Sequence, residues 1–412
     1  MKISIIFSLF VGITSVLNAQ DTLGVSAPDT LRFHKVISGH DAAVESLTFS
    51  NDGAFFATGS WDRKARLYAV DTLKNYTFLR EFSKHQAAIT SMDISADNKY
   101  IAIGSKDFTF SVFELATGKL RFISRDHTNA VSQLFFDPTS AFLISASSDG
   151  TARVYRVVDF EQAKPNSLAL RYTTKINGAQ LSPSKGKFLL ACDDSKVVEI
   201  NVKGAVSAAF LGHSARVGCL DVSHDNKFIA SGSDDKTIRI WDYKSKQVRY
   251  VLEGHGWNIT SVHFSKDDRY LISSCNNGEV KIWDLQTGKE AAHVPTLGTN
   301  ARESKFSPDM KTVAVATLQK KPPYGAILYH TPYEVLVPKK AVPAGSKSAK
   351  NPASAGTKPT MPTAKPVSGS KPAAVVKPAT PATKPAAPST KPAALPTKPA
   401  AGVKPSAPSV KG

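Results

Sequence analysis

A histidine that recurs at a nearly constant interval most constrains what this chain can fold into. Five histidines open similar blocks of sequence, and they are His40, His85, His127, His213 and His255. The intervals are 45, 42, 86 and 42 residues, and 86 is twice 43, so one unit without the histidine fits after the third. A further unit is expected to open at residues 297–300. Seven units of about 43 residues predict a repeat architecture.

The pattern inside one unit is that of short β-strands. In the fifth unit, residues 217–223, 228–233 and 237–241 are rich in β-branched and aromatic side chains, and short polar turns separate them. A fourth strand is expected to run into the next histidine. One such sheet cannot bury both of its faces, so neighbouring units must stack.

The residues that repeat resemble the WD-repeat β-propeller family. The best matches run from Gly212 and His213 to Trp241 and Asp242, and from His255 to Trp283. The resemblance covers residues 31–337. It implies an all-β fold, a seven-bladed propeller made of four-stranded blades.

The resemblance also implies a buried hydrogen-bonded tetrad of His, Ser or Thr, Asp and Trp, because each of these polar groups needs a partner when it is buried. The fifth unit has all four members, and the first and third have tyrosine at the last position. In the sixth unit asparagine replaces the aspartate. In the second unit Ile103 and Phe113 replace two members, while His85 and Asp107 are kept. Packing is therefore expected to be the main contribution that holds these two units. The expected sets are His40, Thr58, Asp62 and Tyr68; His127, Ser145, Asp149 and Tyr155; His213, Ser231, Asp235 and Trp241; His255, Ser273, Asn277 and Trp283.

Two units and the closure of the ring are less strongly indicated. The fourth unit, residues 173–202, has no opening histidine, and the seventh carries residues 318–325 as an expanded loop. If either fails to form a blade, a six-bladed ring is the alternative. Closure is expected from residues 31–37, which would pair with 325–331 and remove an open sheet edge; the competing strand is 333–337.

No residue pattern indicates catalysis. The recurrence of His, Ser and Asp in every unit favours a structural role over a hydrolase triad, which is built once. No phosphate loop or nucleophile elbow occurs, and no cofactor is expected. Metal binding is not expected either, since the three cysteines, Cys192, Cys219 and Cys275, are too far apart in sequence to form a zinc motif. The rival interpretation is an extracytoplasmic enzyme that uses the propeller channel.

A protein partner is expected on the narrow top face, where members of the resembled family often bind theirs. An exposed aromatic side chain at a turn is costly unless a partner covers it, which favours Trp61, although packing of Trp61 on a neighbouring loop is the alternative. The candidate residues are Glu45, Trp61, Lys106, Arg216, Asp234, Trp257, Asn258 and Asn276.

The first 19 residues have the pattern of a secretory signal peptide. Lys2 precedes an apolar run over residues 3–17, which is too short to span a bilayer, and Ala19 precedes the expected cleavage site. A buried strand or an uncleaved anchor is the alternative. Residues 20–30 would be an N-terminal extension. We expect a monomer that is exported to the periplasm or secreted. If the signal is retained, we expect an intracellular scaffold instead.

Positive charge is concentrated in the C-terminal segment. Residues 338–412 contain 13 Lys and 16 Pro and no acidic or aromatic residue, whereas residues 20–337 carry a net charge of only +4 of the total +18. Such a composition predicts a disordered tail with polyproline II character. Evenly spaced lysines favour attachment to an anionic envelope surface or polymer, and a solubilising tail without a partner is the alternative. Specific nucleic-acid binding is not expected.

Overall fold

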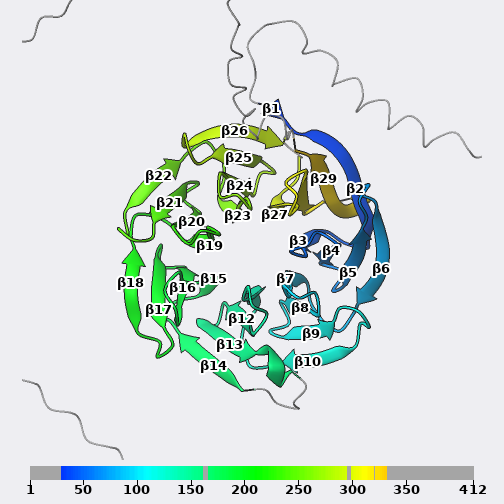
Figure 1. Cartoon of the computed structure of the whole chain (residues 1–412), viewed down its shortest axis with the longest axis horizontal. Coiled ribbons are helices and arrows are strands. Elements are labelled where there is room, and N and C mark those ends of the chain that lie inside the picture. Colours follow the sequence, from blue (N-terminus) through cyan, green and yellow to red (C-terminus); the bar gives the residue numbers. More distant parts are fainter. Residues whose placement is uncertain (1–28, 161–165, 295–297, 320, 332–412) are drawn as a thin grey trace, which may run out of the picture. The chain divides into compact units, whose positions relative to one another are not determined.

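The computed structural model describes residues 29–160, 166–294, 298–319 and 321–331. These residues form seven sheets arranged as the blades of a ring (Figure 1). Six sheets have four antiparallel strands, and the sixth blade has a short fifth strand that pairs in parallel. The prediction of an all-β, seven-bladed propeller is confirmed, and the fourth and seventh units each form a blade. The six-bladed alternative is therefore wrong.

The first four blades follow one another along the chain. The first consists of β3 (Val44–Phe49), β4 (Phe55–Ser60), β5 (Ala65–Val70) and β6 (Tyr76–Phe82). The second consists of β7 (Ile89–Ile94), β8 (Tyr100–Ser105), β9 (Phe110–Glu114) and β10 (Leu120–Ser124). The third consists of β11 (Val131–Phe136), β12 (Phe142–Ser147), β13 (Thr151–Arg156) and β14 (Ser167–Arg171), with the short 3-10 helix η1 (Val157–Asp159) before β14. The fourth consists of β15 (Ile176–Leu181), β16 (Lys187–Cys192), β17 (Val197–Asn201) and β18 (Val206–Phe210).

The last three blades complete the ring. The fifth consists of β19 (Val217–Val222), β20 (Phe228–Ser233), β21 (Ile238–Asp242) and β22 (Val248–Leu252). The sixth consists of β23 (Ile259–Phe264), β24 (Tyr270–Cys275), β25 (Val280–Asp284) and β26 (Lys289–Val294). The seventh consists of β27 (Ala301–Phe306), β28 (Thr312–Thr317) and β29 (Tyr324–His330), with β2 (Arg32–His40) as its outer strand.

The N-terminal strand closes the ring, as the sequence predicts. β2 pairs antiparallel with β29, and Val36 lies opposite Ile327. A closed ring leaves no unpaired blade at the start or end of the array. The competing segment, residues 333–337, lies outside the described residues.

A two-residue strand extends this closure to a second blade. β1 (Asp29–Thr30) pairs in parallel with β26, and the amide of Leu31 donates a 3.1 Å hydrogen bond to the carbonyl of His293. The side chain of Leu31 is buried in the hydrophobic cluster between blades six and seven. The expected boundary at residue 31 is therefore two residues late, since residues 29 and 30 already belong to the propeller.

The hydrophobic core lies between the blades. Each cluster of buried side chains combines residues of two neighbouring blades: Leu47 and Phe56 of the first blade, for example, pack with Ala314 and Leu328 of the seventh. The second strand of each blade is buried most completely, because it has a strand on either side and a blade on either face. The ring thus buries the faces that a single unit would expose.

Tight turns at both ends of the second strand require a left-handed backbone. Asn98 (φ 56°) and Asn226 (φ 61°) occupy this position before the second strand, and asparagine tolerates it better than most residues do. After the second strand, Phe108 has φ 73°, which is uncommon for a bulky side chain. The predicted signal peptide and the lysine-rich tail lie outside the described residues.

Candidate functional site

The fifth blade contains the whole expected tetrad. Nδ1 of His213 lies 2.8 Å from the Asp235 carboxylate, and Nε2 lies 2.8 Å from the hydroxyl of Ser231. The indole of Trp241 donates a 2.8 Å hydrogen bond to the same hydroxyl. Burial alone would raise the pKa of Asp235, but hydrogen bonds from Thr237 and His213 lower it to about 2. The group is a satisfied buried network.

The first blade keeps three of its four expected members. His40 lies 2.7 Å from the Asp62 carboxylate and 2.9 Å from the Thr58 hydroxyl. The hydroxyl of Tyr68 makes no hydrogen bond with ordinary geometry to any described residue. Its ring instead packs in the cluster between blades one and seven, so the expected role of Tyr68 is corrected to packing.

The third blade also departs at its tyrosine. His127 lies 2.9 Å from Asp149 and 2.8 Å from Ser145. The hydroxyl of Tyr155 does not reach Ser145 but donates a 3.0 Å hydrogen bond to Asp126, in the loop before the histidine. A phenol carries its polar atom at the tip of the ring and not on its edge, which explains why tyrosine does not reproduce the tryptophan contact.

The sixth blade moves its carboxylate to a new position. His255 and Trp283 both reach the hydroxyl of Ser273, at 2.7 and 2.8 Å. The expected member Asn277 does not contact the imidazole, and the side chain nearest to Nδ1 of His255 is Glu279, at 3.4 Å. Glu279 also accepts the amide hydrogen bond that the tetrad aspartate accepts in other blades. The assignment of Asn277 is therefore corrected to Glu279.

The second blade has a polar network of which the sequence predicted two members, His85 and Asp107. His85 lies 3.0 Å from Asp107 and 2.8 Å from the hydroxyl of Ser111. Ser111 lies opposite Ile103 in the neighbouring strand, so the hydroxyl has moved across one strand pair. The sequence analysis missed Ser111, which adds a hydrogen bond to the packing that was expected to hold this blade.

The fourth blade replaces histidine by tyrosine and adds a buried carboxylate. Tyr172 donates a 3.0 Å hydrogen bond to Asp194, 22 residues on, the interval that separates histidine and aspartate elsewhere. Glu199 is buried and lies 2.9 Å from the ammonium group of Lys187 and 2.5 Å from the hydroxyl of Tyr243, which comes from blade five. Burial would raise the pKa of Glu199, but hydrogen bonds from Ser182 and Ser207, and then from Tyr243 and Lys187, lower it to about 2.

Seven of the eight candidate top-face residues are joined by side-chain contacts that pass from blade to blade. Glu45 is buried and binds Lys106 at 2.9 Å and Arg302 at 3.0 Å. Arg302, which the sequence did not single out, extends the series toward Asn276 at 3.4 Å. The remaining contacts are Asn276 to Asn258 at 3.0 Å, Asn258 to Asp234 at 3.2 Å, and Arg216 to Asp234 at 2.9 Å. Glu45 therefore organises its neighbours and is not itself an exposed binding group.

Exposed aromatic side chains lie beside this series. Trp61 is 47% exposed; its indole donates a hydrogen bond to Glu45, and Lys106 lies 4.9 Å from its ring centroid. Trp257, the eighth candidate, is 59% exposed. Phe108, at the same kind of turn in blade two, is 45% exposed and was missed by the sequence analysis. Other blades carry Arg63 or Lys236 at this position of the turn. The aromatic side chain is therefore the sequence signal that could have identified Phe108.

Several polar residues of the innermost strands tie the blades together. Thr90 donates to the carbonyl of Val131 at 2.6 Å, and Thr260 donates to the carbonyl of Ala301 at 2.9 Å. These contacts hold each first strand against the next. Thr90 and Thr260, each the second residue of an innermost strand, therefore serve mainly to hold neighbouring blades together.

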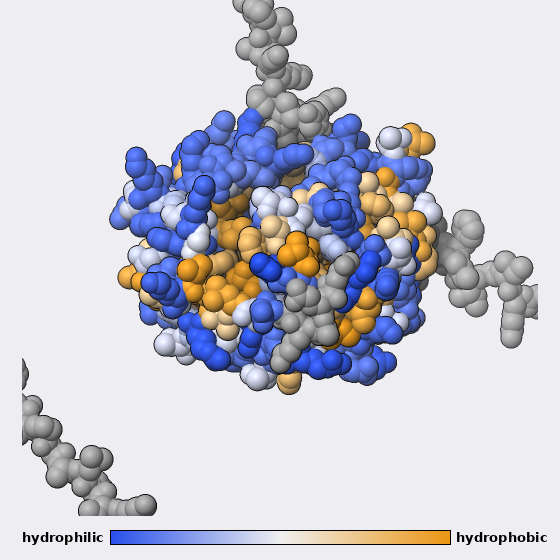
Figure 2. Space-filling view, turned by 60° about the horizontal axis from the view of Figure 1, so that its bottom comes forward, coloured by the Kyte–Doolittle hydropathy of each residue, from blue (hydrophilic) through white to orange (hydrophobic). Residues whose placement is uncertain are grey.

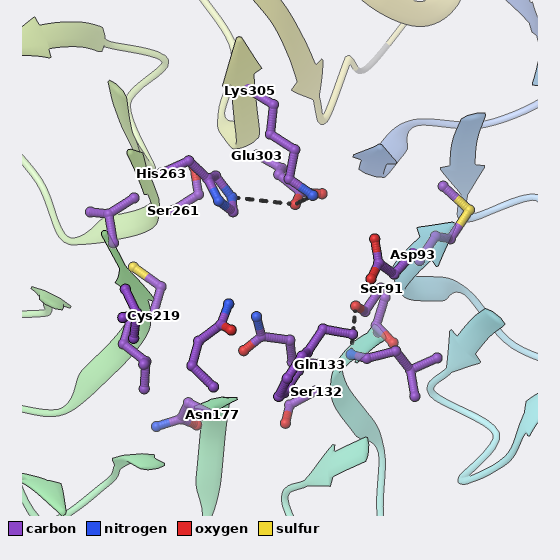
Figure 3. Close-up of a pocket in the computed structure, with 18 of the residues that line it drawn as sticks. Ser91, Asp93, Ser132, Gln133, Asn177, Cys219, Ser261, His263, Glu303 and Lys305 are labelled. Atoms are coloured by element: carbon purple, nitrogen blue, oxygen red, sulfur yellow. Dashed lines mark hydrogen bonds and ion pairs between the residues drawn. The ribbon is translucent and has the colours of Figure 1, made fainter. Parts of the chain in front are cut away.

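A polar channel runs through the centre of the ring and forms a cavity of about 970 Å³ (Figure 3). Carboxylates from the innermost strands accept backbone hydrogen bonds from the next blade: Asp93 from Phe136 at 2.7 Å, and Glu303 from Leu47 at 2.8 Å. The sequence signal for these residues is a polar side chain at every second position of a first strand.

Charged groups gather on one side of the channel. Lys305 lies 2.9 Å from Glu303, and His263 lies 3.6 Å from the same carboxylate, as Figure 3 shows. Burial would raise the pKa of Glu303, but Lys305 and His263 lower it to about 2. Burial raises the pKa of Asp93 to about 6. The cluster brings together groups capable of proton transfer, yet both carboxylates already hold neighbouring blades together.

Seven blades, five of which contain a buried histidine network, define a β-propeller of the WD-repeat type. The sequence matches the family described as WD domain, G-beta repeat, over residues 31–69, 76–114, 118–156, 204–242 and 246–284. The protein belongs to the WD-repeat β-propeller family. The matched segments leave out the fourth and seventh units, which lack the histidine.

Curated relatives come from several eukaryotes. Transducin beta-like protein 2 of Homo sapiens is 25% identical over 244 residues, which are 53% of this chain and 53% of that protein. Transcription initiation factor TFIID subunit 5 of Caenorhabditis elegans is 27% identical over 216 residues, 52% of this chain and 30% of that protein. U3 small nucleolar RNA-associated protein 21 of Saccharomyces cerevisiae is 30% identical over 135 residues, 32% of this chain and 14% of that protein. The chain thus spans about half or less of each of these relatives.

Within the described part of the chain, no helix has the length and apolarity that a membrane crossing requires.

Proposed function

We propose that this WD-repeat protein is a non-catalytic scaffold that binds a protein partner on its top face. The observation that carries the proposal is the exposed indole of Trp61, which Glu45 and Lys106 hold in place. Tryptophan is enriched among the residues that dominate protein interfaces, and an aromatic group that is already ordered loses little entropy on binding. Figure 2 shows hydrophobic patches among hydrophilic residues on the side of the ring that it displays.

Site-specific photocrosslinking tests this proposal. A photoreactive amino acid at position 61, 108 or 257 should give discrete crosslinked species in the native host. The matched control is position 206 on the outer strand β18, because Val206 is exposed to a similar extent, 54%, on a different part of the ring. Equal crosslinking from position 206 would contradict a partner site on the top face.

An enzyme that acts in the channel is the second candidate, and one observation favours it. Asp93, His263, Glu303 and Lys305 surround a cavity large enough for a small ligand. We favour a structural role because the two carboxylates accept backbone hydrogen bonds across blade boundaries. A chromogenic substrate panel distinguishes the two: turnover that Asp93→Asn abolishes and Trp61→Ala preserves would support the enzyme.

Export is part of the proposal and is supported by the sequence of residues 1–19. The intracellular alternative is supported by the relatives, which include a transcription initiation factor subunit and a small nucleolar RNA-associated protein. N-terminal sequencing of the mature protein decides between them. A mature chain that begins at Gln20 supports export, whereas a retained Met1 supports the intracellular scaffold.

The lysine-rich segment is proposed to hold the protein near an anionic surface or polymer. Its 13 lysines and lack of acidic residues support weak binding that salt reverses. Deletion of residues 338–412 should abolish salt-sensitive retention while the circular dichroism spectrum of the propeller stays unchanged. Retention that persists after the deletion would overturn this part of the proposal.

A further inference from the structure

Three side chains with different metal-binding atoms meet at the top of blade six. They are the imidazole of His255, the thiol of Cys275 and the carboxylate of Glu279, and their ligand atoms all lie within 4.8 Å of one another. The carboxylate is 3.4 Å from Nδ1 of His255 and 3.6 Å from Sγ of Cys275. His255 and Cys275 are buried, while the side chain of Glu279 is 28% exposed.

The same positions in other blades carry a different set of atoms. Serine occupies the Cys275 position in four blades, as Ser60, Ser105, Ser147 and Ser233. Threonine occupies the Glu279 position in three blades, as Thr109, Thr151 and Thr237. Blade six therefore departs from its neighbours at several positions around one imidazole, and the departures replace hydroxyl groups by a thiol and a carboxylate.

The two distances that join Glu279 to the imidazole and to the thiol are long for hydrogen bonds and suit a metal, whereas the thiol of Cys275 also lies 2.7 Å from Oδ1 of Asn277. In four other blades the imidazole lies 2.7 to 3.0 Å from its carboxylate, against 3.4 Å here. A tetrahedral zinc ion bound to nitrogen, oxygen and sulfur at about 2.0 to 2.3 Å keeps these atoms about 3.4 to 3.6 Å apart. The two distances that involve Glu279 match the edges of such a tetrahedron.

We propose that Nδ1 of His255, Sγ of Cys275 and the Glu279 carboxylate bind one zinc ion, with water as the fourth ligand. The thiol proton leaves to solvent when the metal binds, as for other cysteine ligands. Mixed nitrogen, oxygen and sulfur ligands suit zinc better than calcium or magnesium, which prefer oxygen alone. The partial exposure of Glu279 gives the ion a route from solvent.

Groups behind the imidazole can support this arrangement. Nε2 of His255 lies 2.7 Å from the hydroxyl of Ser273, which in turn lies 3.5 Å from the carbonyl of Lys281. When that hydroxyl donates to the carbonyl, it accepts the proton of Nε2 and leaves Nδ1 free to bind metal. The nearby ammonium of Lys281 is paired with Glu290 at 2.6 Å, which limits its repulsion of a cation.

Two other blades show why the set in blade six matters. Blade four has Cys192 at the position of Cys275, but it has Tyr172 at the position of His255. Blade five keeps His213 but has Ser233 in place of the thiol. Cysteine spacing does not indicate zinc, because the ligands come from the loop before β23, the end of β24 and the turn before β25, and only one of them is cysteine.

Zinc would fix the loop that presents Trp257. The amide of Gly256 donates a 3.1 Å hydrogen bond to Glu279, so the ligand is already bonded to the backbone beside this tryptophan. The proposal does not rest on the scaffold function, because metal binding is measured on the isolated protein.

Calorimetry with the full-length, untagged chain tests the proposal. The protein is first dialysed against a chelator and then titrated with zinc chloride, and one zinc per chain is expected. Cobalt(II) should produce the ligand-to-metal absorption band of a thiolate complex. Cys275→Ser and Glu279→Thr should each weaken zinc binding at least about 100-fold, at the upper end of the effects seen on metal sites.

Both variants install residues that sister blades carry, so the fold should be kept, and circular dichroism checks this. Cys219→Ser is the matched control, because Ser46, Ser91 and Ser261 occupy the same position in other blades. It should bind zinc as the wild type does. Zinc should raise the Tm of the wild type and of this control alone. A wild type that binds no stoichiometric zinc, or a Cys275→Ser variant with unchanged affinity, overturns the proposal.

Discussion

Blades five and six are neighbours with the same histidine, serine and tryptophan, and they differ in where the carboxylate stands. In blade five Asp235 lies 2.8 Å from the imidazole and closes the network. In blade six Asn277 stands at that position, and Glu279, in the turn just before β25, approaches only to 3.4 Å. The comparison teaches that a repeat can keep its fold when one polar contact is loosened, and that the loosened blade is the one with metal-ligand geometry.

The largest expected effect is the loss of the tight carboxylate. Asp235→Ala should lower the free energy of unfolding by about 3 to 4 kcal/mol, because it leaves His213 and the amides of Ser214 and Thr237 without a buried acceptor. Glu279→Ala should cost about 1 kcal/mol, since its contact is longer and partly exposed. Urea denaturation in the presence of a chelator measures both. Equal losses of unfolding free energy in the two variants would contradict the difference between blades five and six.

The next effect concerns acid. The pKa of Asp235 falls from 3.8 to about 2 in the folded protein, so its ionised form stabilises the fold. This contribution, about 2 kcal/mol, is fully present above pH 4 and is lost as the pH falls toward 2. The stability difference between the wild type and Asp235→Asn should therefore shrink over that range. A difference independent of pH between 5 and 2 would contradict the assignment.

The smallest effect comes from converting blade six to the pattern of blade five. The double variant Asn277→Asp with Glu279→Thr should raise the free energy of unfolding of the metal-free protein by about 1 kcal/mol, because a short contact between carboxylate and imidazole replaces a long one. Asn277→Asp alone is the control and should give no gain, since it places two carboxylates beside one imidazole. A gain from the single variant would show that Glu279 does not occupy the site of the missing aspartate.

The sequence predicted the number of blades because the interval between the remaining histidines is still a multiple of the repeat length where one unit has no histidine. An interval of 86 residues accommodates two units whatever residues fill the gap, and blade four appears there. Closure by the N-terminal strand was readable as well, since β2 resembles the outer strands. The parallel pairing of β1 with β26 was not, because two residues carry too little pattern.

The site was predicted in part. Seven of the eight candidate residues lie in one connected series of contacts, but its link Arg302 was missed because the seventh unit has the weakest repeat pattern. Glu279 and Ser111 were missed for another reason. Position in the repeat identifies the residue that normally supplies a group, whereas a side chain on the adjacent strand or two residues later can bring the same group to the same place.

The sequence by itself determined the all-β repeat fold, its seven units and the histidine networks, because period and hydrophobic alternation are local properties that recur along the chain. The tertiary structure alone decided that Glu279 and not Asn277 approaches His255, which charges line the channel and which blade gathers nitrogen, sulfur and oxygen within 4.8 Å. These outcomes depend on side-chain length and on contacts between strands that are distant in sequence, and a repeat pattern carries neither.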